Sequence, residues 1–534
     1  MRLNDLELRD VTKWEAAGIT LPRYDRQAVR QATEASPVWM HFGAGNIFRA
    51  FPAKSMQMLL DGGLETRGIV VAVETEEEDT IFAPHDNLTL LATLKADGSI
   101  EKTVVGSIVK SLKLDGGKEQ WDRLAEVFAK PSLQMVSFTI TEKGYALHGA
   151  DGGVWPDVAK DFADGPASPV SFMGKAASLL YARYLAGASP VAMVSMDNCS
   201  ENGTRLHGAM LAFAEKWAEN GHADAGFAAY VNDGAKVSFP WSMIDKITPR
   251  PDESVAKMLA ATGFEDTQIT ITSRHSHAAA FVNAEEAQYL VIEDDFPNGR
   301  PALHKAGILF TDRATVGKVE KMKVCTCLNP LHTALAVFGC LLGYTKISDE
   351  MKDADLVKLV EKIGYAEGLP VVVDPGIIEP RAFIDEVLGV RLPNPFMPDT
   401  PQRIACDTSQ KVPIRFGETL KAYAANGMDV TSLRAIPLTL AAWCRYLLGV
   451  DDKGNTFAPS PDPMLETLQA RLAGITLGNT DGCREKLRTV LSDPVYFGVD
   501  LYEVGLGEVA EDLFEEMASA PGAVRKVLER EVRA

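Results

Sequence analysis

One short segment constrains the fold of this chain more than any other. An apolar run over residues 38–42 leads directly into the turn Gly-Ala-Gly at 43–45, and a helix-like pattern follows from residue 46. A strand, a Gly-x-Gly turn and a helix form the setting in which a dinucleotide pyrophosphate meets a helix N-terminus. The segment therefore predicts an α/β fold whose first Rossmann-like strand ends at a dinucleotide site.

Five residues of this segment are candidates for binding the cofactor. Gly43 allows the tight turn, and Gly45 lets the backbone approach the phosphates closely. Asn46, Phe48 and Arg49 follow at the start of the helix, and Phe48 occupies the third position of the G-x-G-x-x-G fingerprint, where glycine or alanine is usual. Because the fingerprint is incomplete, a tight turn without a ligand is the alternative interpretation.

An acidic residue ends the second candidate strand. The apolar run 68–73 is followed by Glu74, which lies 74 − 45 = 29 residues beyond Gly45. A carboxylate at this place accepts hydrogen bonds from the ribose hydroxyls and repels a 2′-phosphate, which favours NAD over NADP without excluding NADP. The usual interval is about 20 residues, so the first helix and its loop must be long. A solvated acidic loop over residues 74–79 is the alternative.

The pattern of apolar residues changes near residue 300. Before it, short apolar runs alternate with amphipathic stretches, as in a wound α/β sheet; after it, long helical patterns dominate. We therefore expect a Rossmann-like domain over residues 1–300 and a mainly α-helical, substrate-binding domain over 301–534, with a proline-rich loop at 392–401. The expected strands are 38–42, 68–73, 133–139 and 191–196, and the expected helices are 50–60, 118–128, 172–185, 332–342, 351–363, 433–448 and 507–517.

Composition excludes several partners. The formal charge is −19, from 54 basic and 73 acidic residues, so nucleic acid and anionic membrane surfaces are poor partners. No apolar stretch approaches the roughly 20 residues that span a bilayer, and the charged N-terminal segment lacks the apolar core of a secretory signal. Seven scattered cysteines indicate a reduced, cytoplasmic protein. Cys325 and Cys327 are expected to be structural thiols, and no metal site is predicted.

The segment 321–332 places three chemically useful side chains close together, just before a strongly apolar helix. A lysine such as Lys323 can shuttle the proton of an alcohol, and Asn329 can stabilise the negative charge that develops on its oxygen. His332, three residues later, can share a helix face with Asn329 and bind a second hydroxyl. The alternative is a surface lysine, a helix-capping asparagine and a packed histidine.

A second polar cluster, residues 197–203, follows the expected strand 191–196. Open α/β sheets bind ligands at the carboxyl ends of their strands, so Asn198 is placed where a nicotinamide and a substrate would lie. An Asx turn that caps the next helix is the alternative interpretation.

The loop 394–416 is rich in cations although the chain as a whole is acidic. Arg403, Lys411 and Arg415 are suited to hold the carboxylate of a sugar acid, the arginines in a bidentate manner. They are equally suited to balance acidic neighbours. His275 and His277 have no acidic or cysteine companion nearby and are interpreted as loop or packed histidines.

Six ordered motifs carry a family resemblance: HFGAGNIFRA, TITEKGY, SMDNCSENG, FPWSMIDKITP, QYLVIEDDFPNGRP and LNPLH. The chain resembles the long-chain mannitol dehydrogenase family, which includes fructuronate and tagaturonate reductases, over roughly residues 38 to 450. The resemblance implies a zinc-independent, NAD(P)-linked polyol or aldonate dehydrogenase with an N-terminal Rossmann domain and a mainly helical C-terminal domain.

The resemblance also implies roles for single residues. Lys323 matches the catalytic lysine, Asn198 and Asn329 match the two oxyanion asparagines, and His332 matches the family's histidine. The family usually has five positions from the lysine to the second asparagine, whereas this chain has six. Either a local bulge absorbs the extra residue or another residue, with Lys321 in reserve, serves as the base.

The resemblance further indicates a substrate. The stretch 399–419 is more like the fructuronate-reductase branch than the mannitol branch, which makes Arg403 and Lys411 the expected substrate-binding residues. We therefore expect NAD-dependent interconversion of D-fructuronate and D-mannonate. Reduction of tagaturonate, oxidation of mannitol-type polyols and a non-catalytic NAD-binding sensor are the alternatives. The sequence leaves open whether the protein is a monomer or a homodimer.

Overall fold

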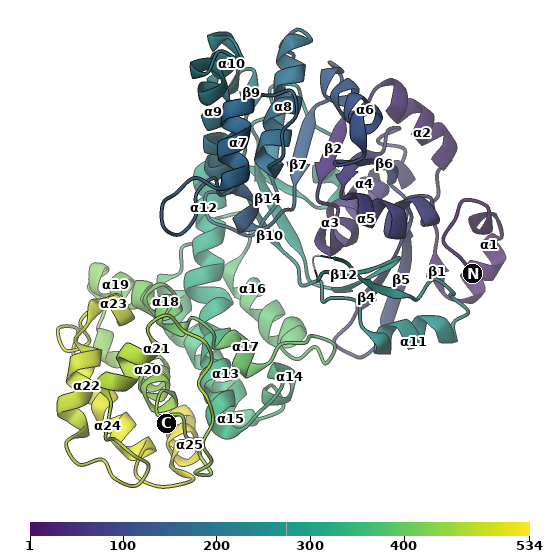
Figure 1. Ribbon diagram of the computed structural model, residues 1–534. Helices are drawn as coiled ribbons and strands as arrows, with labels where there is room; N and C mark the ends of the chain where they lie inside the picture. Colours follow the sequence, from purple (N-terminus) through teal and green to yellow (C-terminus); the bar gives the residue numbers. More distant parts are fainter. Residues whose placement is uncertain (274, 534) are drawn as a thin grey trace. The chain divides into compact units, whose positions relative to one another are not determined.

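In the computed structural model, which describes residues 1–273 and 275–533, the chain divides into two units (Figure 1). The first unit comprises Met1–Lys95 and Ser99–Gly317; the second comprises Ala96–Gly98 and the chain from Lys318 onward. The first unit is a mixed α/β structure and the second is mainly helical. The predicted fold class is therefore confirmed.

The first unit is organised by a sheet of six parallel strands. Their order is that of a doubly wound dinucleotide-binding fold, 3-2-1-4-5-6 when the strands are counted along the chain. The order reverses between the two central strands, so a ligand is expected at their carboxyl ends. Across the sheet the strands are β6 (Ile108–Lys113), β3 (Ile69–Val73), β2 (Trp39–Phe42), β7 (Met135–Phe138), β8 (Val191–Ser195) and β9 (Val237–Ser238).

Side chains alternate between the two faces of this sheet along each strand, and both faces are buried. In β2, Met40 and Phe42 point to one hydrophobic cluster, which also contains side chains of α6 (Gly117–Ala129), α8 (Phe172–Leu185) and α9 (Asn202–Glu219). Trp39 points to the opposite cluster, with α3 (Asn46–Ala50) and α4 (Pro52–Asp61). Burial on both faces explains why the predicted strands are continuous apolar runs.

The helix after the glycine turn differs from the prediction of a single helix over 50–60. It is divided into α3 and α4 at Phe51, whose dihedral angles are φ −125° and ψ −71°. Pro52 is the first residue of α4, where its missing N–H costs no helical hydrogen bond. The short α3 thus ends before Phe51, and α4 begins at the proline.

Three further sheets complete the first unit. A mixed sheet has the order β1-β5-β4-β13, a second has the order β10-β14-β15, and β11 and β12 form a hairpin. The strands are β1 (Ile19–Thr20), β4 (Thr89–Leu94), β5 (Ile100–Val105), β10 (Ser242–Asp245), β11 (Ile269–Ile271), β12 (His277–Ala279), β13 (Phe281–Glu285), β14 (Tyr289–Glu293) and β15 (Leu309–Thr311).

Two central helices dominate the second unit. Every residue of α20 (Ala435–Tyr446) is buried, and in α13 (Asn329–Leu342) all residues are buried except the half-buried Asn329, His332 and Leu342. Helices that are apolar on all sides belong in the interior of a bundle. Around them pack α15 (Ala354–Glu361), α24 (Gly507–Met517) and α25 (Ala523–Arg533). The predicted helices 332–342, 433–448 and 507–517 correspond to α13, α20 and α24.

One continuous helical stretch, Arg313–Leu342, is long and apolar enough to cross a membrane by length and composition alone. The expectation that no stretch approaches this length is therefore wrong. The apolar window of this stretch is 72% buried within the protein, as is typical of a core helix.

The turn at Gly43 depends on the absence of a side chain. Its φ is +79°, and a Cβ atom added there would lie 2.4 Å from the backbone oxygen of Thr139. We expect Gly43→Ala to reduce the free energy of unfolding by clearly more than the roughly 1–2 kcal/mol that a left-handed conformation costs an L-residue. Gly63→Ala is the matched control, because Gly63 has φ +65° but open space around it. Equal losses in urea unfolding of the two variants would contradict the steric account.

Candidate functional site

A chain of buried side chains supports the glycine turn from within the sheet. His41 on β2 is fully buried; its Nδ1 lies 2.7 Å from Ser137 Oγ, and its Nε2 lies 2.9 Å from Thr139 Oγ1. The Thr139 hydroxyl donates to the Gly43 carbonyl at 2.6 Å, and Trp39 Nε1 donates to Ser137 Oγ at 2.7 Å. The chain of hydrogen bonds thus runs from the core of the sheet to the turn.

These contacts fix the protonation of His41. Ser137 Oγ accepts from Trp39 and can donate its own hydrogen to Nδ1 of His41 when that nitrogen is unprotonated. Thr139 Oγ1 donates to Gly43, so it accepts from Nε2, which must carry the ring hydrogen. Burial holds the pKa of His41 well below its ordinary value, and the ring stays neutral. A neutral ring with one donor and one acceptor satisfies every member of the chain.

A cavity of about 160 Å³ opens beside the turn. Three of the predicted cofactor residues line it, namely Gly45, Asn46 and Arg49. The buried Arg49 guanidinium donates to Asn46 Oδ1 at 3.0 Å and to the Ala279 carbonyl at 2.9 Å, and burial lowers the pKa of Arg49 to about 10. The cavity therefore combines a glycine turn, a helix start and a charged arginine, with the acidic Glu77 also in its lining.

Phe48 and Glu74 lie outside the lining of this cavity. Phe48 is fully buried and stacks on His41 with ring centroids 3.4 Å apart, which leaves its side chain no accessible surface. Glu74 follows β3 and precedes α5 (Thr75–Glu77). Two residues that the sequence interpretation missed, Glu77 and His277, do line the cavity. His277 is on the β11–β12 hairpin, and no signal in the local sequence shows that it lines the same cavity as this turn.

The carboxyl end of β8 is tied to that of β7 by Asp197. Its carboxylate accepts from the backbone N–H groups of Ile140 at 2.8 Å and Thr141 at 3.0 Å and from the Tyr145 hydroxyl at 2.6 Å. Burial raises the pKa of Asp197, and these three donors stabilise its charged form. Asn198 follows immediately, with an exposed side chain. The backbone of Asn198 is therefore held at the carboxyl end of β8, as the sequence predicts.

In the second unit, Lys323 begins a π-helical turn, Lys323–Cys327. The N–H of Leu328 donates to the Lys323 carbonyl at 3.1 Å, five residues back. A π turn holds one residue more than an α turn, so it accommodates the six-position spacing from Lys323 to Asn329. Of the two explanations offered for the extra residue, the bulge is therefore present in the structure. Lys323 is only 4% exposed, whereas Lys321 is exposed.

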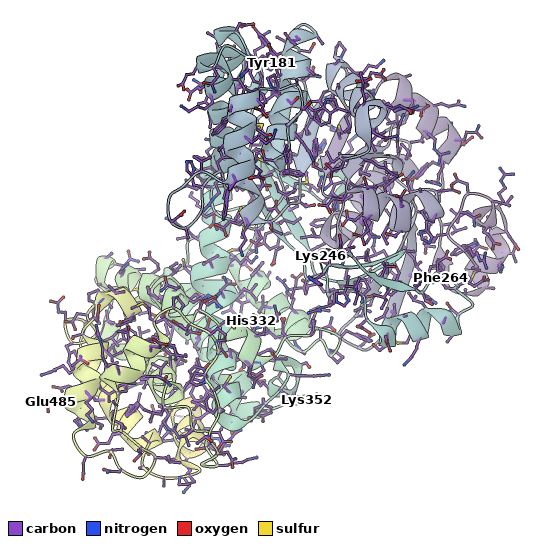
Figure 2. All side chains as sticks on the ribbon, viewed as in Figure 1. Tyr181, Lys246, Phe264, His332, Lys352 and Glu485 are labelled. Carbon is purple, nitrogen blue, oxygen red and sulfur yellow. The ribbon has the colours of Figure 1, made fainter. Side chains whose placement is uncertain are left out.

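Asn329 and His332 lie in the first turn of α13. The Thr333 hydroxyl donates to the Asn329 carbonyl at 2.9 Å. Nε2 of His332, a residue labelled in Figure 2, lies 3.6 Å from Asp399 Oδ2. Burial, followed by the charges of neighbouring cations, lowers the pKa of His332 to about 3. His332 is therefore neutral at physiological pH and can bind a hydroxyl without carrying charge. The cations are Arg415, Arg403, Arg391 and Lys411.

The three cations of the loop 394–416 have different partners. Arg403 forms an ion pair with the buried Asp399, which connects it to His332. The ammonium of Lys411 donates to the backbone carbonyls of Ile404, at 3.0 Å, and Cys406. Arg415 donates to the Thr333 hydroxyl at 2.6 Å. The structure thus gathers all three near His332, within the second unit.

Cys325 is half-buried and Cys327 is buried. Burial raises the pKa of Cys325 to about 11 and that of Cys327 to about 12, so both remain protonated thiols. Across residues 1–273 and 275–533, no group of three or more histidine, cysteine or acidic side chains is arranged to hold a metal ion.

Comparisons with known proteins agree with this architecture. Residues 38–305 match the mannitol dehydrogenase Rossmann domain, and residues 315–513 match the mannitol dehydrogenase C-terminal domain. The chain belongs to the mannitol dehydrogenase family. The family resemblance read from the six motifs is therefore confirmed, and the chain is an oxidoreductase.

Individual relatives cover most of the chain. It is 50% identical to a D-mannonate oxidoreductase of Thermotoga maritima, over 100% of this chain and 99% of the relative. It is 30% identical to a D-mannonate oxidoreductase of Escherichia coli, over 80% and 84%. Among solved structures, a Pseudomonas fluorescens mannitol 2-dehydrogenase in ternary complex with NAD and D-mannitol is 27% identical over the full length of both chains, with a TM-score of 0.69.

The hydrogen-bond chain at the turn gives a stability prediction. Thr139→Val removes the hydroxyl that connects His41 to Gly43 and leaves the buried Nε2–H of His41 without an acceptor. We expect the free energy of unfolding to fall by about 1–3 kcal/mol, and affinity for NADH to fall with it. Thr139→Ser keeps the hydroxyl and is the control. Valine and serine variants that behave alike in urea unfolding and in NADH titration would refute this role.

The environment of His332 gives a pH prediction. Its pKa in the folded protein lies below the ordinary value of 6.5, so the stability contributed by the neutral ring is complete above pH 6.5 and is lost as the pH falls towards 3. We expect ring-labelled histidine NMR to show the His332 signal unchanged from pH 8 to 5. The signal that is absent from His332→Gln identifies it. A midpoint near 6.5 would show that the ring is not shielded as described.

Proposed function

We propose that the protein is an NAD-dependent oxidoreductase that interconverts D-fructuronate and D-mannonate. The observation that carries the proposal is the buried Lys323 on a π turn directly before the helix that bears Asn329 and the neutral His332. These residues match the acid/base and oxyanion groups that reduction of a ketone requires. The 50% identity to a D-mannonate oxidoreductase supports this substrate pair.

Each site residue has a defined task in the proposed reaction. NAD(H), when bound, supplies the hydride or accepts it. During reduction, the Lys323 ammonium donates a proton to the oxygen of the former carbonyl, while the carboxamide N–H groups of Asn329 stabilise its developing negative charge. Asn198 is assigned as the second oxyanion asparagine by its match to the family. During oxidation, the neutral amine of Lys323 accepts the proton of the secondary alcohol. Neutral His332 holds a neighbouring hydroxyl.

The cofactor assignment rests on the first unit. Gly43, Gly45 and Asn46 lie at the switch point of the sheet, where backbone N–H groups can hold the pyrophosphate, and Arg49 adds positive charge beside them. Glu74, at the end of β3, would bind the ribose hydroxyls and repel a 2′-phosphate, so NAD is favoured over NADP. The related structure from Pseudomonas fluorescens, solved with NAD, supports the same choice.

The location proposed for the enzyme is the cytoplasm. All seven cysteines are free thiols, and most are buried. Thiols persist in reducing compartments.

A mannitol-type activity is the second candidate. The relatives include a mannitol 2-dehydrogenase of Cereibacter sphaeroides, 29% identical over 85% of this chain. A panel of D-fructuronate, D-tagaturonate, D-fructose and fructose 6-phosphate, followed by NADH consumption, distinguishes the candidates. The proposal expects D-fructuronate to have the highest kcat/KM. Faster reduction of either neutral or phosphorylated ketose would overturn it, and binding of NADH without turnover of any compound would indicate a sensor.

The role of Lys323 is tested by comparing the alanine variants of Lys323 and of its neighbour Lys321. We expect Lys323→Ala to lower kcat by about 10²–10⁴-fold, the usual contribution of a general acid or base, while NADH binding stays nearly unchanged. Lys321→Ala is the matched control, because Lys321 is exposed and two residues away. If the Lys321 variant loses activity and the Lys323 variant keeps it, the acid/base assignment passes to Lys321.

A further inference from the structure

We propose that Arg415 is the carboxylate-binding residue of the substrate site, and that it sets the preference for sugar acids over neutral polyols. The inference rests on the proposed function and adds to it the group that recognises the acid. It differs from the sequence-based prediction, which assigned substrate binding to Arg403 and Lys411.

Arg415 is held in place by the helix that bears the candidate catalytic residues. It lies on the π-helical segment η10 (Pro413–Gly417), which packs against α13. Its Nη1 donates to the Thr333 hydroxyl at 2.6 Å, and this hydroxyl donates in turn to the Asn329 carbonyl at 2.9 Å. The guanidinium is therefore positioned relative to Asn329 through two consecutive hydrogen bonds.

The remaining N–H groups of the Arg415 guanidinium make no hydrogen bond to the described residues. Among the described residues, Arg415 has no acidic partner, and its Nε–Nη2 edge makes no hydrogen bond within the protein. Burial lowers the pKa of Arg415 to about 10, so the group remains charged at neutral pH. A half-buried charge without a counterion is unfavourable alone, and a carboxylate that binds both donors of the free edge would neutralise it.

The other two cations of the loop are already engaged. Arg403 is neutralised by Asp399, and the Lys411 ammonium donates to two backbone carbonyls. Arg415 also lowers the pKa values of His332 and Lys411 more than any other charge does, which places it close to both. Arg415 is thus the one of the three that combines a charge without an acidic partner among the described residues with two free, parallel donors beside His332.

This arrangement explains a preference for acids. A sugar acid pairs its carboxylate with the free edge of Arg415 while His332 holds a hydroxyl. A neutral polyol leaves the guanidinium without a counterion, and sites with unpaired buried polar groups reject such analogues strongly.

The experiment compares Arg415→Gln and Arg415→Lys with the wild-type enzyme in reduction of D-fructuronate. We expect Arg415→Gln to raise KM by about 30-fold or more, because truncating one partner of a buried charge pair weakens binding by that order. Lysine keeps the charge but loses the bidentate edge, so its KM should lie between the two. Arg415→Ala should recover affinity when guanidinium ion is added, which a purely structural role would not produce.

Arg434→Gln is the matched control, since Arg434 is an exposed arginine of the same unit; its KM should be unchanged. If the wild-type enzyme reduces D-fructuronate and the KM of Arg415→Gln stays within threefold, the inference is wrong and the proposed function stands. If D-tagaturonate is the substrate instead, the same KM comparison on it decides the inference. If only neutral ketoses are reduced, both fail. Should Arg415→Gln not fold, judged by circular dichroism, the lysine variant decides.

Discussion

The hydrogen-bond chain from Trp39 through His41 to Gly43 is the interaction on which the first unit depends. It places a neutral imidazole inside an apolar sheet, where a polar group is tolerated only if all its partners are supplied. In return, it fixes the orientation of the Gly43 carbonyl at the point where the strand order reverses. The turn is thereby shaped before any ligand arrives, which lowers the entropic cost of binding one.

The second unit uses the same principle around α13. Thr333, Asp399 and Arg415 connect the first turn of this helix to a loop about 70 residues further along the chain. The π turn at Lys323–Cys327 adds one residue ahead of the helix, and the lysine that begins it is buried. Such insertions are frequent at functional sites, because they rotate side chains out of the regular helical register. Positively charged side chains are concentrated around His332 on α13, in a protein whose net charge is strongly negative.

Features that depend on local pattern could be predicted from the sequence. The runs 68–73 and 191–196 are strands because β-branched and other apolar residues dominate them, with Ser195 as the one polar side chain, and 172–185 and 507–517 are helices with the predicted bounds. The break at Phe51 was missed because apolar periodicity continues through it, although Pro52 was a usable signal. Phe48 was assigned to the cofactor from its position in a fingerprint, whereas its side chain packs on His41.

Features that depend on contacts between distant segments could not be predicted. The Asp197 carboxylate accepts hydrogen bonds from Ile140, Thr141 and Tyr145, and no feature of the sequence near residue 197 predicts these partners. The neutralisation of Arg403 by Asp399 is local, four residues apart, but that no acid within the described residues pairs with Arg415 is a property of the fold. The sequence therefore predicts three candidate cations for binding a carboxylate, and the structure is needed to distinguish among them.

A crystal structure of the enzyme with NAD⁺ and D-mannonate tests the account most directly. We expect the secondary alcohol oxygen to lie within about 3.2 Å of Lys323 Nζ and of the Asn329 carboxamide, with the carboxylate on the free edge of Arg415. An alcohol oxygen bound by other groups, with the Lys323 ammonium directed away from it, would contradict the central claim.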